Sequence, residues 1–95
     1  MGLGLEESLR LTMAALMQAT GESQRSVASA LGLTQTQVSR RQSGSTSWTL
    51  RDVDALAGHY GVAALDLLSG PTRACEALSA DRRHSVRGEV EEADR

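Results

Sequence analysis

The feature that most constrains the fold is a pair of short helical segments that meet at a turn around Gly32. Ser23 is placed to cap the first segment and Thr34 to cap the second, because a hydroxyl at a helix start accepts a bond from a free backbone N–H. The chain must reverse within about three residues, which calls for a left-handed backbone at Gly32. Ala28 is small enough to let the two segments approach closely. This pattern predicts two helices that cross steeply.

The second of these helices has the clearest start in the sequence. Thr34 and Gln37 have the spacing of a capping box, in which the hydroxyl bonds forward and the amide reaches back. A run of small and hydroxyl residues around Gly44 ends the helix. The apolar residues expected to fill the wedge between the two helices are Val27, Leu31, Leu33 and Val38.

Three further helices are predicted from apolar spacing and from the residues at their ends. They cover residues 5–19, the stretch between Thr49 and Gly61, and roughly residues 63–68. The apolar stripe of the first is Leu5, Leu9, Met13, Leu16 and Met17. The inward face of the second is Leu50, Val53, Leu56, Ala57 and Tyr60. In the short last helix we expect Leu65 and Leu68 to face the core and Leu67 to lie off the core stripe.

Composition favours an all-α fold. Leu, Ala and Val dominate the apolar residues, Phe is absent, and Trp and Tyr occur once each, which suits packed short helices better than a β-sandwich. With 95 residues the chain has room for one core, and we predict a five-helix domain over residues 1–70. Residues 71–95 are rich in charge and small side chains, so we expect a tail that is weakly helical or disordered and buries little. Its sizeable apolar groups are Cys75, Leu78 and Val86.

Charge is sorted along the chain. The formal net charge is −2, yet no acidic residue lies between Ser23 and Leu50. Only the face that meets phosphates has to be basic in a protein that binds nucleic acid. The arginines within or next to the acid-free window are Arg25, Arg40, Arg41 and Arg51. The distribution predicts a local anion-binding face on an otherwise acidic chain.

Several classes of protein are not supported by the sequence. No apolar run approaches the ~20 residues that cross a bilayer and no signal segment opens the chain, so we expect a cytoplasmic protein without membrane association. Cys75 is the only cysteine, which leaves no internal disulfide and no second thiolate for zinc. Nothing resembles a nucleophile–base pair or a phosphate-cradling glycine loop. We therefore expect no enzyme activity, no metal and no cofactor.

The two central helices, with the Ser-Gln opening of the first, resemble those of the lambda-repressor-like helix-turn-helix proteins (the Cro/C1, or XRE, family). The resemblance covers roughly residues 9–70 and includes the downstream stretch Gly-Val-Ala-Ala-Leu-Asp-Leu-Leu-Ser-Gly. It implies a DNA-binding domain whose third helix enters the major groove.

The resemblance also assigns DNA contacts. Gln24 matches the glutamine that bonds a phosphate and braces the first side chain of the recognition helix, and the loop after that helix holds phosphates through amides and hydroxyls. The base-reading set is Gln35, Thr36, Gln37, Ser39 and Arg40. The backbone-contact set is Gln24, Arg25, Thr34, Arg41, Ser43, Ser45 and Thr46.

The chemistry of the base-reading set agrees with this role, because Gln can bond adenine and Arg can bond guanine through two atoms each. The alternative is a capped, solvated helix start with no reading role.

Three positions depart from the family pattern. The family pairs a basic residue late in its first helix with a glutamate late in its third, and here these places hold Met17 and Gln42. An inward position near the end of the third helix, usually apolar, holds Arg41. We expect either that Trp48 covers this place or that the helix ends early. Arg41 could then be a phosphate clamp or a stem that covers the core.

The predicted function is that of a sequence-specific regulator of double-stranded DNA, a repressor of phage, plasmid or mobile-element type. A single domain reads few base pairs, so we expect a homodimer on a pseudo-palindromic operator. The dimer surface is expected on residues 63–68, through Leu65, Leu67 and Leu68, or on the tail. The alternative is a protein-interaction module, such as an antitoxin or anti-activator, whose tail binds a protein partner.

Overall fold

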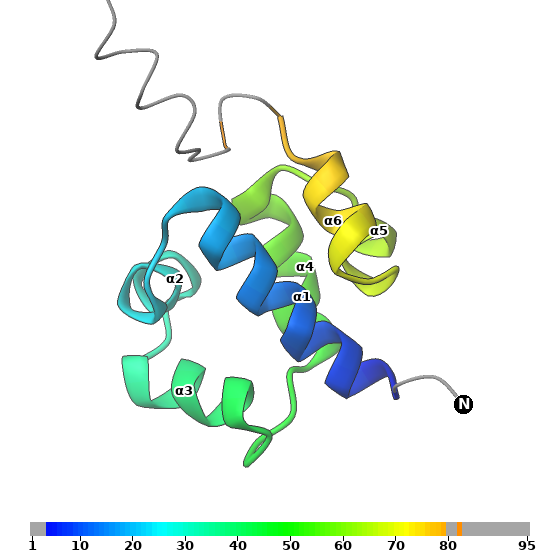
Figure 1. Cartoon of the computed structure of the whole chain (residues 1–95). Coiled ribbons are helices and arrows are strands. Elements are labelled where there is room, and N and C mark those ends of the chain that lie inside the picture. Colours follow the sequence, from blue (N-terminus) through cyan, green and yellow to red (C-terminus); the bar gives the residue numbers. More distant parts are fainter. Residues whose placement is uncertain (1–3, 80–81, 83–95) are drawn as a thin grey trace, which may run out of the picture.

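The computed structural model describes residues 4–79 and 82, and these residues form helices and no strand (Figure 1). In chain order the helices are α1 (Leu5–Thr20), α2 (Gln24–Leu31), α3 (Gln35–Ser43), α4 (Leu50–Tyr60), α5 (Ala64–Leu68) and α6 (Pro71–Ala77). The predicted all-α class is confirmed, and α1 to α5 lie where the caps and apolar spacing placed them.

Side-chain caps and left-handed glycines determine where the central helices begin and end. Ser23 Oγ accepts from the Ser26 N–H at 3.1 Å at the start of α2. Gly32 has φ 73°, a left-handed backbone conformation that residues with a Cβ rarely adopt. The N–H of the next residue, Leu33, donates to Ala28 O at 2.9 Å. This turn brings α3 back across α2 within a few residues, as the sequence predicted.

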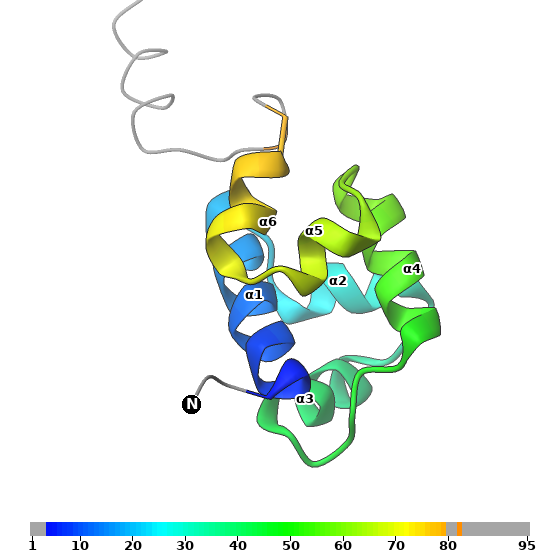
Figure 2. The same ribbon diagram turned by 90° about the vertical axis from the view of Figure 1, so that its right-hand side faces the viewer.

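Helix α1 is the longest of the described helices. It packs against α3 on one side and against α5 and α6 on the other, while α4 packs against α2 and α5 (Figures 1 and 2). Both views place α3 at one end of the molecule and α6 at the other. The buried apolar residues are Leu9, Met13, Leu16, Val27, Ala28, Val38, Trp48, Val53, Leu56, Ala57, Tyr60, Leu67, Ala74 and Leu78.

The expected orientation of α5 was wrong. Leu67 is fully buried and Leu65 is 76% exposed, the reverse of the prediction, while Leu68 is half-buried against the core. A helix of five residues makes little more than one turn, so its own spacing carries little information about its inward face. Its contacts with α1, α4 and α6 set that face instead.

The first residues of α1 and α4 also differ from expectation. Leu5 and Leu50 were assigned to inward stripes, but both side chains are exposed. Each is the first residue of its helix, beyond the part that packs on a neighbour.

Residues beyond Pro71 bury more than predicted. Pro71 opens α6 at the first helical position, where its missing N–H removes no helix bond. Ala74 and Leu78 are buried in the core, and α6 packs along α1. The remaining part of the predicted tail, residues 80, 81 and 83–95 with Val86, lies outside the described residues.

Candidate nucleic-acid interface

Helix α3 presents a polar face to solvent. Val38 is its one fully buried side chain, and the helix lies at the end of the molecule away from α5 and α6 (Figures 1 and 2). The structure places the predicted base-reading residues Gln35, Thr36, Gln37, Ser39 and Arg40 together on this helix, and all are exposed. The predicted reading face is therefore an accessible surface of one helix.

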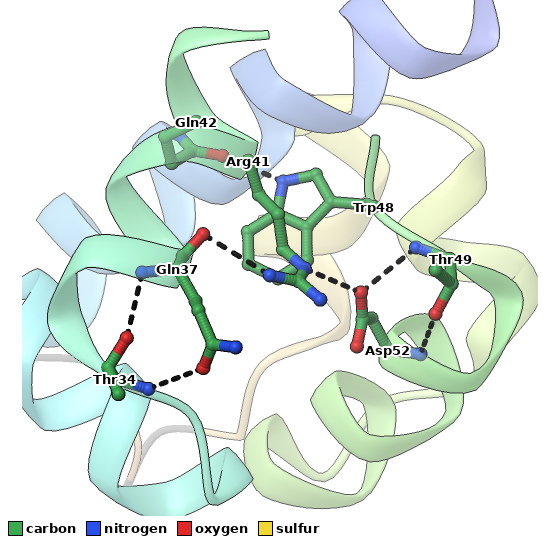
Figure 3. A network of polar contacts seen from close by, with 7 residues as sticks. All are labelled: Thr34, Gln37, Arg41, Gln42, Trp48, Thr49 and Asp52. Atoms are coloured by element: carbon green, nitrogen blue, oxygen red, sulfur yellow. Dashed lines mark hydrogen bonds and ion pairs between the residues drawn. The ribbon is translucent and has the colours of Figure 1, made fainter. Parts of the chain in front are cut away.

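Most of this face is free of intramolecular bonds. Within the described residues, the side chains of Gln35, Thr36, Ser39 and Arg40 form no hydrogen bond or ion pair. Gln37 differs, because its Oε1 accepts from the Thr34 N–H at 2.8 Å while Thr34 Oγ1 accepts from the Gln37 N–H at 3.1 Å (Figure 3). The predicted capping box is confirmed, and it occupies two side chains that were also assigned to DNA.

The backbone-contact set is more scattered. Gln24 and Arg25 begin α2, where Gln24 is half-buried and Arg25 is exposed. Ser43, Ser45 and Thr46 form an exposed loop after α3.

The loop amides are largely used within the chain. The Ser45 N–H bonds Ser43 Oγ at 3.4 Å, the Thr46 N–H bonds Arg40 O at 3.2 Å, and the Ser43 and Ser45 hydroxyls lie 3.1 Å apart. The Ser43 hydroxyl also donates to Arg40 O at 3.0 Å, so both amides and hydroxyls of this exposed loop have partners within the chain.

Arg41 has partners inside the chain (Figure 3). Its Nε donates to Asp52 Oδ2 at 2.8 Å, its Nη1 donates to Gln37 O at 3.3 Å, and its side chain is 14% exposed. The guanidinium carbon lies 5.8 Å from the centre of the Trp48 ring, close enough for a cation–π contact. The expectation that Trp48 covers this place is confirmed, and an early end to the helix is wrong, since α3 continues to Ser43.

Sequence reasoning missed Asp52 as the partner of Arg41. The two residues are eleven positions apart, and no local spacing rule connects residues on different helices. The available signal was the Thr49-x-x-Asp52 spacing of a second capping box, which the structure contains at the start of α4. Asp52 Oδ2 accepts from the Thr49 N–H at 2.9 Å as well as from Arg41.

Gln42 and Trp48 tie the end of α3 to α1. The Trp48 Nε1–H donates to Gln42 Oε1 at 3.0 Å, and Gln42 Nε2 donates to Arg10 O at 3.1 Å. In the lambda-repressor-like proteins that the sequence resembles, the place of Gln42 holds a glutamate in an ion pair; here it holds a chain of neutral hydrogen bonds. Because these hydrogen bonds join neutral groups, they avoid the desolvation cost of a buried ion pair.

Exposed positive charge remains at the start of α2, on α3 and at the start of α4. Arg25, Arg40 and Arg51 are exposed and form no ion pair among the described residues. Partial burial raises the pKa of Asp52, but the Thr49 N–H and the Arg41 guanidinium outweigh it and hold that pKa below its ordinary value. Asp52 is therefore ionised at neutral pH, and its charge is offset by Arg41.

Two further properties of the described residues narrow the chemistry. None of their helices has both the length and the apolar character needed to cross a membrane. No three His, Cys, Asp or Glu side chains among them are grouped as metal ligands would be.

Two short helices joined by a glycine turn, the second with an exposed polar face, are the arrangement of a helix-turn-helix DNA-binding domain. The family model of the BetR domain matches residues 6–87, so the chain belongs to the BetR domain family. This is a helix-turn-helix-like family of DNA-binding domains, which gives the chain a DNA-binding regulatory role. Neither the curated proteins nor the solved structures gave a match.

Proposed function

We propose that this chain is a sequence-specific transcriptional regulator of the Cro/C1 type, a repressor of phage, plasmid or mobile-element kind, that reads double-stranded DNA with α3. One observation carries the proposal. Gln35, Thr36, Ser39 and Arg40 are exposed and unbonded on a helix whose start and end are both held in place. Free amide and guanidinium groups on a fixed helix are what base reading in the major groove requires. We propose no catalytic activity and no cofactor.

Phosphate contacts are assigned to groups that flank this face. Arg25 is exposed on α2, and the hydroxyls of Ser43, Ser45 and Thr46 are exposed after α3. The sequence between Ser23 and Leu50 contains no carboxylate, and the one that the fold brings to this loop is Glu6, which accepts from Ser47 Oγ at 2.9 Å. Binding is accordingly expected to weaken steeply with salt, since each phosphate neutralised releases counterions.

We further propose a homodimer on a pseudo-palindromic operator, with half-sites about one helical turn (~34 Å) apart. Because Leu67 is buried, a dimer surface on α5 would use the exposed Leu65 and the half-buried Leu68. Two bound copies would supply the affinity that one short reading face lacks.

The first test is selection of bound duplexes from a random-sequence pool. A pseudo-palindrome preferred over random DNA by ~1000-fold or more is the expected result. A single enriched half-site would retain DNA reading and remove the dimer. Absence of enrichment at low salt would favour a protein-interaction module instead.

The selected duplex then tests the assigned residues. Gln35→Ala and Arg40→Ala should each weaken binding by ~10-fold or more, because each removes a contact to a base edge. Arg73→Ala is the control, since it removes a positive charge on α6, at the opposite end of the molecule from α3. Unchanged binding by both α3 variants would reject α3 as the reading helix.

A further inference from the structure

We propose that Arg41 and Asp52 are positioning residues: their ion pair holds α3 at the angle from which it reads bases, and Arg41 does not bind a DNA phosphate. The inference rests on the proposed reading of DNA by α3. It replaces the assignment of Arg41 to the DNA backbone, and it gives Asp52, an acid on a DNA-binding domain, a role in binding.

The backbone packing leaves one side of α3 without close support. The helix packs closely on α2 and on α1, but α3 and α4 are not among the helix pairs that pack closely together. Val38 is its one fully buried side chain. Its link to α4 therefore runs through side chains, and the Arg41–Asp52 pair is the direct one (Figure 3).

The Asp52 end of this link is fixed in place. Asp52 is part of the capping box of α4, where its Oδ2 accepts from the Thr49 N–H at 2.9 Å and the Thr49 hydroxyl accepts from the Asp52 N–H at 3.0 Å. Its side chain is 12% exposed. The carboxylate therefore provides Arg41 with an anchor whose position is set by the start of α4.

The Arg41 side chain is also held in place by several contacts. Nε bonds Asp52, Nη1 bonds Gln37 O one turn earlier, and the guanidinium lies over the Trp48 ring. Trp48 is in turn bonded to Gln42, so the arginine lies within a continuous network from α1 to α4. Arg41 follows Arg40 directly, so a rotation of α3 that breaks the pair would also move a base-reading side chain.

A phosphate clamp at Arg41 predicts the opposite behaviour. Asp52 would then compete with the phosphate for the guanidinium, and removing its charge would release Arg41 to DNA. Asp52→Asn separates the two roles, because Asn keeps an oxygen for the Thr49 N–H and loses the charge that holds Arg41. Asp54→Asn is the matched control, since Asp54 is exposed on the same helix and has no ion-pair partner among the described residues.

The experiment compares Asp52→Asn, Arg41→Gln, the double variant and Asp54→Asn in the full chain. Each is titrated against the duplex selected by the unaltered protein and against a scrambled duplex, over a series of salt concentrations. For positioning, we expect each single variant to lose ~10-fold in affinity for the selected duplex, with little change on the scrambled one. The double variant should lose no more than either single change, the salt slope should stay unchanged, and Asp54→Asn should keep its preference.

Other outcomes overturn the proposal. Tighter binding of both duplexes by Asp52→Asn, with a salt slope steeper by ~0.9, would identify Arg41 as a phosphate contact. Losses that add in the double variant would show that the two residues do not act as a pair. If the unaltered chain prefers no sequence, the proposed function fails and this inference fails with it. A preference that survives in every variant removes the inference alone.

Circular dichroism of each variant at the binding temperature establishes that it is folded. If Asp52→Asn does not fold, Arg41→Gln answers the same question, because it removes the charge that pairs with Asp52. For Arg41→Gln, a ~10-fold loss on the selected duplex with an unchanged salt slope would support the proposal, and an equal loss on both duplexes with a salt slope shallower by ~0.9 would overturn it.

Discussion

At the scale of single residues, a small polar cluster joins the turn before α2 to the end of α4. Glu22 Oε2 lies 2.7 Å from His59 Nε2 and accepts from Ser26 Oγ at 3.2 Å. The buried Tyr60 hydroxyl lies near the same carboxylate without a hydrogen bond to it, and this burial together with Glu22 raises the Tyr60 pKa well above its ordinary value. Because Glu22 follows the end of α1, the cluster fixes the entry of the chain into α2.

The stability of the protein is expected to fall in acid because of Glu22. Burial raises the pKa of this carboxyl, but the neighbouring Tyr60 and His59 outweigh it and hold the pKa below its ordinary value of 4.5. A depressed pKa contributes stability that is present above the ordinary value and is lost as the pH falls through the folded value. Asp52, whose pKa is also lowered, acts in the same direction below its ordinary value of 3.8.

Urea unfolding between about pH 6 and pH 3 measures this dependence. Glu22→Gln should lower the free energy of unfolding near neutral pH by about 1 kcal/mol and flatten its decline in acid. Glu7→Gln, at an exposed position of α1 with no ion pair among the described residues, should leave both unchanged. An equally steep decline for Glu22→Gln would show that other groups carry the acid sensitivity.

At the scale of elements, local sequence signals predicted where the helices begin and end. They did not predict contacts between residues on different helices. Thr34 and Thr49 were identified as caps because a cap and the groups it bonds lie within a few residues of each other. The inward face of α5 was predicted wrongly, since one turn of helix is oriented by its neighbours. The Arg41–Asp52 pair was not predicted, because the two residues lie on different helices and only the tertiary fold brings them together. The exposure of the polar face of α3 was predicted correctly, since a single buried residue, Val38, sets the orientation of α3; that this face reads bases stays a prediction.

Substitution of two glycines by Ala should change the free energy of unfolding in opposite directions, one in a turn and one inside a helix. Gly32 has φ 73° and Gly58 lies inside α4, and a Cβ at either would meet no atom within 4 Å. Gly32→Ala should therefore cost about 1 kcal/mol or more through backbone strain alone, whereas Gly58→Ala should add about 0.5–1 kcal/mol by restricting the unfolded chain. Urea unfolding followed by circular dichroism measures both. Equal effects would mean that the turn at Gly32 does not need a left-handed residue.

At the scale of the whole molecule, α6 completes the core from the side opposite α3. It packs along α1, and its residues Ala74 and Cys75, together with Leu78 just beyond, contact the core cluster. The family match continues to residue 87, past the end of this helix. The folded unit therefore includes α6, and α1 is held on one side by α6 while α3 and its exposed polar face lie on the other. Stability lost at α6 would reach DNA binding through α1.

Leu78 and Leu65 offer a matched test of this arrangement. Leu78 is 4% exposed and Leu65 is 76% exposed, so the same change to Ala removes a core contact in one and a surface group in the other. Leu78→Ala should lower the free energy of unfolding by about 2–4 kcal/mol, and Leu65→Ala by no more than about 0.5 kcal/mol. Sedimentation equilibrium on the same variants adds the dimer question. If Leu65→Ala shifts the protein toward monomer without a loss of stability, α5 is the dimer surface, because an exposed leucine contributes to association only where a partner covers it. If Leu78→Ala is as stable as the unaltered chain, the residue that follows α6 adds nothing to the core, and its contact is not part of the support that α1 receives.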